Sequence, residues 1–265
     1  MKILIIGDVV GRPGRHLLRD ELPSIRAEGD IDLVVANGEN AAGGAGITAR
    51  TAEEIFSSGV DVITSGNHIW DQKEAIKYIA EQPRLLRPIN YPEGTPGCGF
   101  YVSEETGYPP VVVVNVHGRV FIETGFSCPF LSMERLLAEI QREKSLDQAA
   151  IVVDFHGEAT SEKQAFARHF DGQVSAVIGT HTHVQTADAR LLPRGTAYVT
   201  DVGMTGPSEG ILGVKPGPVI RRFRTQMPTR FQVAGGPRMI NAAVLDFIYD
   251  EGRPQVRHIS MMNRS

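Results

Sequence analysis

The sequence predicts a layered α/β fold, and three observations support this prediction. Short β-branched runs recur along the chain, each run ends in a turn of small residues, and a helix-like segment follows most of them. Apolar runs bounded by Gly and Asn are typical of buried strands in a largely parallel sheet. The alternation of such strands with helices favours layers of helices packed on sheets.

The first half of the chain contains three of these strands, and helix-start signals lie beside them. The strands are predicted at residues 2–6, 32–36 and 60–64. Thr51 with Glu54, and later Ser161 with Gln164, have the spacing of a capping box, which marks the start of a helix. We therefore expect helices to begin at Thr51 and Ser161.

The second half continues the pattern with longer connections. Further strands are predicted at 109–116, 150–155, 175–178, 196–200 and 239–247, and residues 133–144 have the periodicity of an amphipathic helix. Two stretches, near 84–110 and 203–238, are predicted to be loop excursions. Because no linker or repeat interrupts the chain, we interpret residues 1–265 as a single domain.

Composition excludes several classes of protein. The chain has 265 residues, of which 42% are hydrophobic and 22% charged, so general disorder is excluded. A net charge of −4 argues against a protein that coats nucleic acid, and we expect no stable nucleic-acid complex. No run approaches the ~20 apolar residues of a membrane helix. Two cysteines cannot form a disulfide framework or a Cys-rich zinc site. We expect a cytoplasmic protein without membrane contact.

Polar residues follow the predicted strands at the points where the strands end. Ligands of open α/β sheets bind beyond the carboxyl ends of the strands, so we expect these side chains to converge on one crevice. They are Asp8, Glu39, Asn40, Asn67, His68, His156, His181 and His183.

Carboxylate and amide oxygens mixed with imidazoles suit Mn, Fe or Zn. There are enough such ligands for two metal ions if one carboxylate bridges them. His181 and His183 are alternate residues of an extended segment, so both can face one cation. Taken singly, Asp8 is also explained as a helix cap, Asn67 as a turn residue and His156 as a structural hydrogen-bonding residue. Their conjunction in this order favours the metal site.

Several motifs resemble those of the calcineurin-like metallophosphoesterase superfamily. Gly38-Glu39-Asn40, Gly66-Asn67-His68 and residues 179–183 carry this resemblance. Nearly the whole chain is similar to the bacterial YmdB-type branch, the 2′,3′-cyclic-nucleotide 2′-phosphodiesterases. The motifs of that resemblance are Gly7-Asp8-Val9-Val10-Gly11, Thr64-Ser65-Gly66-Asn67-His68, Arg87-Pro88 with Asn90-Tyr91-Pro92, and Asp201-Val202-Gly203-Met204.

The resemblance implies an α/β/β/α sandwich with helices outside and a dinuclear metal centre. Oxygen and nitrogen ligands suit iron and manganese similarly, so we expect one of these metals. The first metal would bind Asp8, Glu39, Asn40 and His183, and the second Glu39, Asn67, His156 and His181. The chain departs from the wider superfamily in two ways: the usual Asp-x-His opening is Asp8-Val9-Val10, and the usual bridging Asp is Glu39. Asn40 would fill the resulting gap at the first metal, or would instead hydrogen-bond a phosphate oxygen.

The mechanism expected from this centre is hydrolysis of a phosphodiester. A hydroxide held between two cations attacks phosphorus in line, and a general acid protonates the departing alkoxide. We assign the acid to His68, with hydrogen bonding to the substrate as its alternative role. By resemblance the O2′ bond of a 2′,3′-cyclic nucleotide breaks, leaving a 3′-phosphate. Asp201 either orients a ligand histidine or forms an ordinary turn.

Other interpretations stay open at this point. Gly7, Gly11 and Gly14, with Glu39 after the second strand, loosely resemble a dinucleotide-binding start. A non-enzymatic regulator that senses a nucleotide or RNA end would carry the same ligands. The remaining histidines, His16, His117, His169 and His258, are interpreted as structural or surface residues. Family resemblance also suggests a homo-oligomer.

Overall fold

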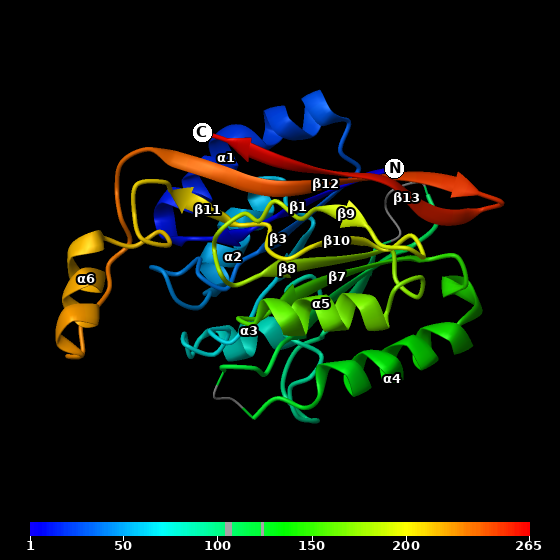
Figure 1. Cartoon of the computed structure of the whole chain (residues 1–265), viewed down its shortest axis with the longest axis horizontal. Helices are drawn as coiled ribbons and strands as arrows, with labels where there is room; N and C mark the ends of the chain where they lie inside the picture. The colour runs from blue at the N-terminus through cyan, green and yellow to red at the C-terminus, as the bar shows by residue number, and fades with distance from the viewer. Residues whose placement is uncertain (104–107, 123–124) are drawn as a thin grey trace.

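Two β-sheets pack face to face in the computed structural model, which describes residues 1–103, 108–122 and 125–265 (Figure 1). The first sheet contains β1 (Lys2–Ile6), β2 (Asp8–Val9), β3 (Leu33–Asn37), β4 (Val62–Thr64), β11 (Met204–Pro207), β12 (Arg238–Asp250) and β13 (Arg253–Arg264). The second contains β5 (Phe100–Ser103), β6 (Val111–His117), β7 (Ala150–His156), β8 (Ala176–Thr180), β9 (Arg190–Leu191) and β10 (Ala197–Val199).

Six helices are described, and the first five of them lie on the outer faces of this sandwich. The six are α1 (Gly11–Gly29), α2 (Ala49–Ser57), α3 (Ala75–Glu81), α4 (Pro129–Arg142), α5 (Thr160–His169) and α6 (Pro216–Thr225), with a 3₁₀ turn at Lys144–Leu146. One apolar cluster joins α1, α2 and α3 to the first sheet, and another joins α4 and α5 to the second. The predicted α/β/β/α layering is confirmed, whereas α6 projects from the body (Figure 1).

Alternation of side chains along the strands builds these layers. Ile3 and Ile5 of β1 belong to the apolar cluster between the two sheets, while Leu4 and Ile6 belong to the cluster under the helices. Both faces of the strand are therefore buried, which is why it reads as a continuous apolar run. Within each sheet the neighbouring strands β1, β3 and β4, and likewise β6, β7, β8 and β10, are parallel. Their carboxyl ends share one edge of the molecule.

Both predicted helix-start signals were wrong in position. The side chain of Thr48 caps α2 and forms a reciprocal capping box with Thr51, which is thus the third helical residue. The helix α5 has Ala159 at its N-cap and no side-chain cap, so Ser161 lies inside the first turn. Thr51 has the three-residue spacing of a capping box both to Thr48 before it and to Glu54 after it. The sequence pattern alone does not decide which residue is the N-cap.

The predicted excursions contain elements of the sheets. The stretch 84–110 includes β5, an edge strand of the second sheet, and its residues 104–107 lie outside the described part of the chain. The stretch 203–238 includes both β11, which pairs with β2 and β12, and the projecting α6. Residues 203–238 therefore form an excursion only beyond β11. A single domain stays a prediction.

The glycines of α1 serve close packing. A Cβ atom added at Gly14 would lie 2.4 Å from the carbonyl oxygen of Thr205, so the helix approaches β11 as closely as only glycine allows. This contact accounts for a glycine that resembled part of a dinucleotide-binding motif.

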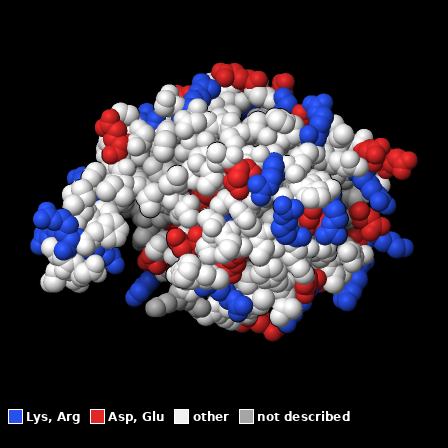
Figure 2. Space-filling view, in the orientation of Figure 1, with Lys and Arg blue, Asp and Glu red and all other residues white. Residues whose placement is uncertain are grey.

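Both signs of charge are present on the surface shown in Figure 2. Lys and Arg alternate with Asp and Glu on this face, and basic side chains gather on the projecting α6. Among the described residues, none of the helices combines the length and apolarity needed to span a membrane.

Candidate metal centre

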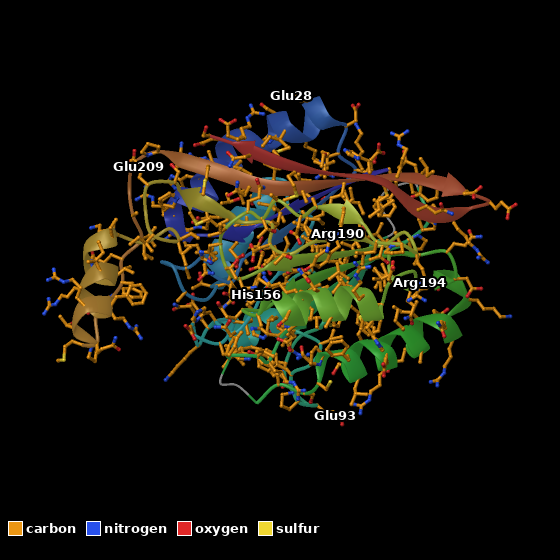
Figure 3. The ribbon with its side chains drawn as sticks, in the orientation of Figure 1. Glu28, Glu93, His156, Arg190, Arg194 and Glu209 are labelled. Carbon is orange, nitrogen blue, oxygen red and sulfur yellow. The ribbon has the colours of Figure 1, made fainter. Side chains whose placement is uncertain are left out.

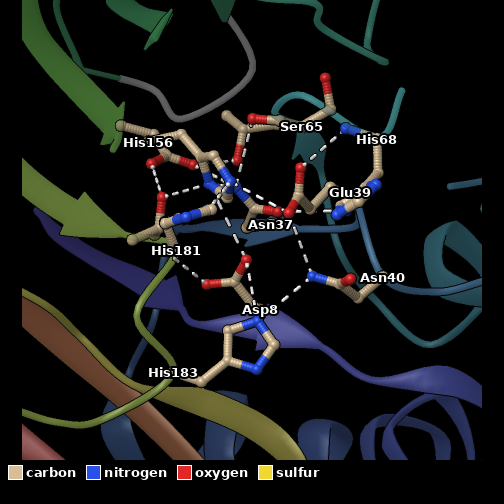
Figure 4. A network of polar contacts seen from close by, with 12 residues as sticks. Asp8, Asn37, Glu39, Asn40, Ser65, His68, His156, His181 and His183 are labelled. Atoms are coloured by element: carbon tan, nitrogen blue, oxygen red, sulfur yellow. Dashed lines mark hydrogen bonds and ion pairs between the residues drawn. The ribbon is translucent and has the colours of Figure 1, made fainter. Parts of the chain in front are cut away.

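Strand ends from both sheets bring the predicted residues to one edge of the sandwich. Asp8 opens β2, Glu39 and Asn40 follow β3, and Asn67 and His68 follow β4. The second sheet contributes His156, the last residue of β7, and His181 with His183 after β8. Figure 4 labels all of these residues except Asn67 and shows them in one network of polar contacts. Figure 3 shows His156, which is buried, away from the peripheral Glu28, Glu93 and Glu209.

Glu39, His156 and His181 form the tightest part of the network. One ligand atom from each lies within 4.8 Å of the other two. The Nε2 atom of His156 is 3.0 Å from Oε1 of Glu39 and 3.0 Å from Nδ1 of His181. Glu39 and His156 are buried, and the side chain of His181 is 20% exposed. The structure brings these three predicted residues together; the first sheet supplies Glu39 and the second supplies the two histidines.

The protonation of this cluster follows from its burial and its charges. Burial alone would lower the pKa of His156, but Glu39 and the neighbouring carboxylates raise it to about 9. Burial would raise the pKa of Glu39, yet the charge of His156 holds it well below its usual range. Burial, followed by the charge of His156, lowers the pKa of His181 to about 2. The carboxylate of Glu39 thus favours a positive charge on its neighbours, and a cation held by these three side chains would compete with the proton of His156.

Asp8 provides a second indication of a cation site. The carboxylate is buried; its Oδ2 accepts a hydrogen bond from the backbone N–H of His181 at 3.1 Å, while Oδ1 has no hydrogen-bond partner among the described residues. Burial raises the pKa of Asp8 to about 6. An unpartnered buried carboxylate oxygen is costly unless a cation or another donor satisfies it. The donor set therefore fits metal ions.

Asn40 links Glu39 to His183. The Nδ2 atom of Asn40 is 3.2 Å from Oε1 of Glu39 and 3.2 Å from Nε2 of His183. The same Nε2 is 3.8 Å from Oδ1 of Asp8. These four residues are the predicted ligands of the first metal, and they are brought together.

Each of the three candidate imidazole ligands has its other ring nitrogen occupied by an oxygen. His156 Nδ1 is 2.9 Å from the hydroxyl of Thr180, and His183 Nδ1 donates to the carbonyl oxygen of Leu212 at 3.1 Å. His181 Nε2 pairs with the carboxylate of Glu158 at 3.2 Å. These bonds orient the rings and leave the opposite nitrogen of each toward the centre, as in known metal sites.

Asn67 lies beside a histidine that the sequence analysis placed outside the site. His117, buried at the end of β6, has Nε2 3.2 Å from Oδ1 of Asn67, and its Nδ1 contacts the carbonyl oxygen of Gly118. Burial lowers the pKa of His117 to about 3, so the ring is neutral and Nε2 carries a lone pair. A lone pair on Nε2 does not pair with the oxygen of Asn67, so we infer that the amide is turned by 180°, with its NH₂ group donating to His117 and its carbonyl oxygen on the opposite side.

His68 lies at the rim of the network and not within it. Its side chain is 39% exposed, and its Nδ1 pairs with the Asp71 carboxylate at 2.8 Å. The backbone N–H of His68 donates to Oε2 of Glu39 at 3.3 Å. The turn leaves no room for a side chain at Gly66, because an added Cβ atom would lie 2.2 Å from Oε2 of Glu39. The ring is therefore beside the candidate ligands without being one of them.

A buried acid that the sequence analysis missed ties the two sheets together beneath the site. Asp154 accepts hydrogen bonds from Asn37 at 3.0 Å and from the Thr180 hydroxyl at 2.6 Å, and also contacts the hydroxyl of Thr64. Asn37 comes from the first sheet and Thr180 from the second, so this carboxylate fixes their relative position. The only sequence signal is a polar residue inside the apolar run 150–156.

Asp201 holds the segment that carries the two histidines. It accepts hydrogen bonds from the backbone N–H and hydroxyl of Thr182 at 2.9 and 2.8 Å, and it forms a fully buried ion pair with Lys163 at 2.9 Å. His181 and His183, on either side of Thr182, have positive φ angles of 100° and 64°. Such strained backbone persists where neighbouring contacts determine it. Asp201 thus orients the histidine segment and also closes its own turn to Gly203 at 2.9 Å.

A cavity of about 820 Å³ opens over the network. Glu39, Asn40, His68, His181 and His183 line its inner side. This volume is within the range of small-molecule sites. Four of the metal-ligand candidates, Glu39, Asn40, His181 and His183, are therefore accessible from this cavity.

Comparison with known proteins relates this site to a family. Residues 4–260 match the model of the YmdB-like protein family. The chain is 46% identical over 257 residues to the 2′,3′-cyclic-nucleotide 2′-phosphodiesterase of Bacillus subtilis, covering 97% of this chain and 95% of that protein.

Solved structures support the same relationship. A phosphatase from Mycoplasma pneumoniae is 33% identical, covers 99% of this chain and 92% of its own, and superposes with a TM-score of 0.90. The calcineurin-like phosphoesterase YfkN of Bacillus subtilis is 11% identical, with a TM-score of 0.59 over 100% of this chain and 90% of its own. The second likeness concerns the fold alone.

Proposed function

Since the chain belongs to the YmdB-like family, we propose that it opens 2′,3′-cyclic nucleotides to 3′-phosphates at a dinuclear metal centre. The chain is a hydrolase that acts on phosphoric esters, as its named relatives are. The observation that carries the finer proposal is the convergence of Asp8, Glu39, Asn40, His156, His181 and His183 beneath an open cavity.

The metallophosphoesterase fold implies divalent metal ions. We propose Asp8, Glu39, Asn40 and His183 as ligands of one ion, and Glu39, Asn67, His156 and His181 as ligands of the other. When bound, two such cations lower the pKa of a water molecule and neutralise charge on the phosphoryl oxygens. The unpartnered oxygen of Asp8 and the hydrogen-bonded outer nitrogens of the three histidines support this assignment.

His68 is proposed as the general acid for the departing O2′. Its Nδ1 is held by Asp71 at 2.8 Å, so a protonated ring keeps its Nε2 proton for the substrate. The ring lines the cavity together with Glu39, Asn40, His181 and His183. His68 lies beside the proposed ligands, lines the cavity and is oriented by Asp71, so its ring is suited to transfer a proton to the substrate.

Other properties stay predictions from the sequence. These are iron or manganese as the metal, assembly as a homo-oligomer, absence of a stable nucleic-acid complex and location in the cytoplasm. The sensing regulator and the enzyme differ in a single measurable property, which is turnover of a diester.

The experiment that tests the proposal follows the reaction of the metal-loaded protein with 2′,3′-cyclic AMP by ³¹P NMR. We expect the cyclic-phosphate signal to be replaced by that of adenosine 3′-phosphate. Accumulation of adenosine 2′-phosphate would contradict the assigned bond cleavage. An unchanged substrate, with metal bound, would contradict the enzymatic function.

A further inference from the structure

The cavity above the candidate metal centre has two chemically different sides. Carboxylate, amide and imidazole groups form the inner side, whereas Leu212, Val214, Val219, Phe223 and Phe231 form much of the outer side. We call these five residues the apolar wall. A substrate that consisted only of a phosphate ester would leave this wall facing water.

The apolar wall comes from α6 and the segments at its base. The side chain of Phe223 on α6 is 74% exposed and that of Phe231 is 40% exposed, although both line the cavity. The guanidinium of Arg222 lies over the ring of Phe231, 5.5 Å from its centroid. Large aromatic residues exposed together beside a cavity are typical of a binding surface.

The wall is attached directly to the metal-site residues. The carbonyl oxygen of Leu212 accepts the hydrogen bond from Nδ1 of His183 at 3.1 Å. At the base of α6, the backbone N–H of Lys215 donates to Gln232 at 2.8 Å and that of Ala234 donates to Gly213 at 2.9 Å. The two segments that lead to and from α6 are therefore hydrogen-bonded to each other. The helix projects from the body of the molecule (Figure 1), and its residues Val219 and Phe223 line the cavity.

We propose that Phe223 and Phe231 bind the nucleobase of the substrate by stacking and thereby favour nucleotides over cyclic phosphates that lack a base. This inference rests on the proposed function, because it places the cyclic phosphate at the strand-end residues and the base against the apolar wall. A nucleotide has the matching asymmetry of a charged ester and a flat ring. Stacking accepts every base, so we expect purines and pyrimidines to differ by less than about tenfold.

The test compares two substrates that differ only in the base. They are 2′,3′-cyclic AMP and methyl riboside 2,3-cyclic phosphate, in which a methoxy group replaces adenine. We expect the wild-type protein to prefer the nucleotide in kcat/KM by about tenfold or more. Phe223→Ala and Phe231→Ala should each lower this preference about fivefold or more, mainly through a higher KM for the nucleotide.

Three further variants separate stacking from other effects. Phe223→Tyr should keep the preference, while Phe223→Leu, which is apolar but not aromatic, should lose most of it. Ile220→Ala is the matched control, because Ile220 lies on the same helix, is 49% exposed and does not line the cavity. It should retain the wild-type preference.

Two results would overturn the inference while leaving the proposed function intact. One is equal hydrolysis of both substrates by the wild-type protein, and the other is an unchanged preference in both alanine variants. A change in sedimentation of Phe223→Ala, with the preference unchanged, would assign the wall to contact between copies of the chain.

If the wild-type protein opens neither substrate, the proposed function fails. The role of the apolar wall is then tested by measuring ligand binding. Calorimetry with adenosine 3′-phosphate and ribose 3-phosphate should then still show tighter binding of the nucleotide, with the difference reduced in Phe223→Ala. Equal affinities would contradict the role of the wall.

Discussion

The strand-end site and the projecting α6 border the same cavity but differ in burial, polarity and hydrogen bonding. Glu39 and His156 are buried and held by hydrogen bonds from both sheets, whereas Phe223 is 74% exposed. Rigid sheet edges can hold charged ligands within a few tenths of an ångström, while an excursion can vary without disturbing them. The difference leads us to predict that the chemistry and the choice of substrate depend on separate parts of this chain.

The largest effect is expected at the carboxylate that both candidate metals share. Glu39→Gln removes a charge that contacts His156 at 3.0 Å and lies 3.2 Å from Asn40. We expect the metal content to fall and kcat/KM for 2′,3′-cyclic AMP to decrease at least about 1,000-fold. Elemental analysis and initial rates measure both, with the exposed Glu81→Gln as control. Full activity without bound metal would refute the assignment.

His68 should separate activity from metal binding. His68→Ala removes the proposed acid without removing a ligand, so kcat should fall by about 10²–10⁴-fold while the metal content stays that of the wild type. Asp71→Asn should have a smaller effect, since Asp71 contacts only the rear nitrogen of the ring at 2.8 Å. The exposed His258→Ala is the control. A normal kcat in His68→Ala would assign proton transfer to another group.

The buried pair beneath the histidine segment should affect stability most. Lys163→Met leaves the fully buried Asp201 without its cation and is expected to lower the free energy of unfolding by about 3–5 kcal/mol. Denaturant unfolding of the metal-free protein measures this. The exposed Lys77→Met should change it by no more than about 0.5 kcal/mol. Equal stability of the two variants would contradict the supporting role of the pair.

The smallest effect on stability is expected on α6. Phe223→Ala should change the free energy of unfolding by about 0.5 kcal/mol or less, because the side chain buries little surface. The same denaturant measurement applies. A loss above about 2 kcal/mol would show that Phe223 packs as part of the core, and the contrast between the two regions would disappear.

The sequence was sufficient to predict that polar residues at the strand ends would lie close together, because a parallel sheet gathers the carboxyl ends of its strands. It could not show that Asn37 of one sheet and Asp154 of the other meet, since such a contact depends on how the sheets pack. His117 was missed because it lies in no motif, and Lys163 because it occupies an ordinary helix position. β13 was missed because exposed polar residues interrupt its apolar alternation.

The central claim is that the strand-end residues hold two cations on which hydrolysis depends. Its most direct test is titration of the metal-free protein with Mn²⁺, recording bound metal and the rate of 2′,3′-cyclic AMP opening in the same samples. We predict that the rate reaches its maximum as a second equivalent binds, and that Glu39→Gln binds neither ion tightly. A maximal rate in the metal-free protein, or saturation at one equivalent, would contradict the account.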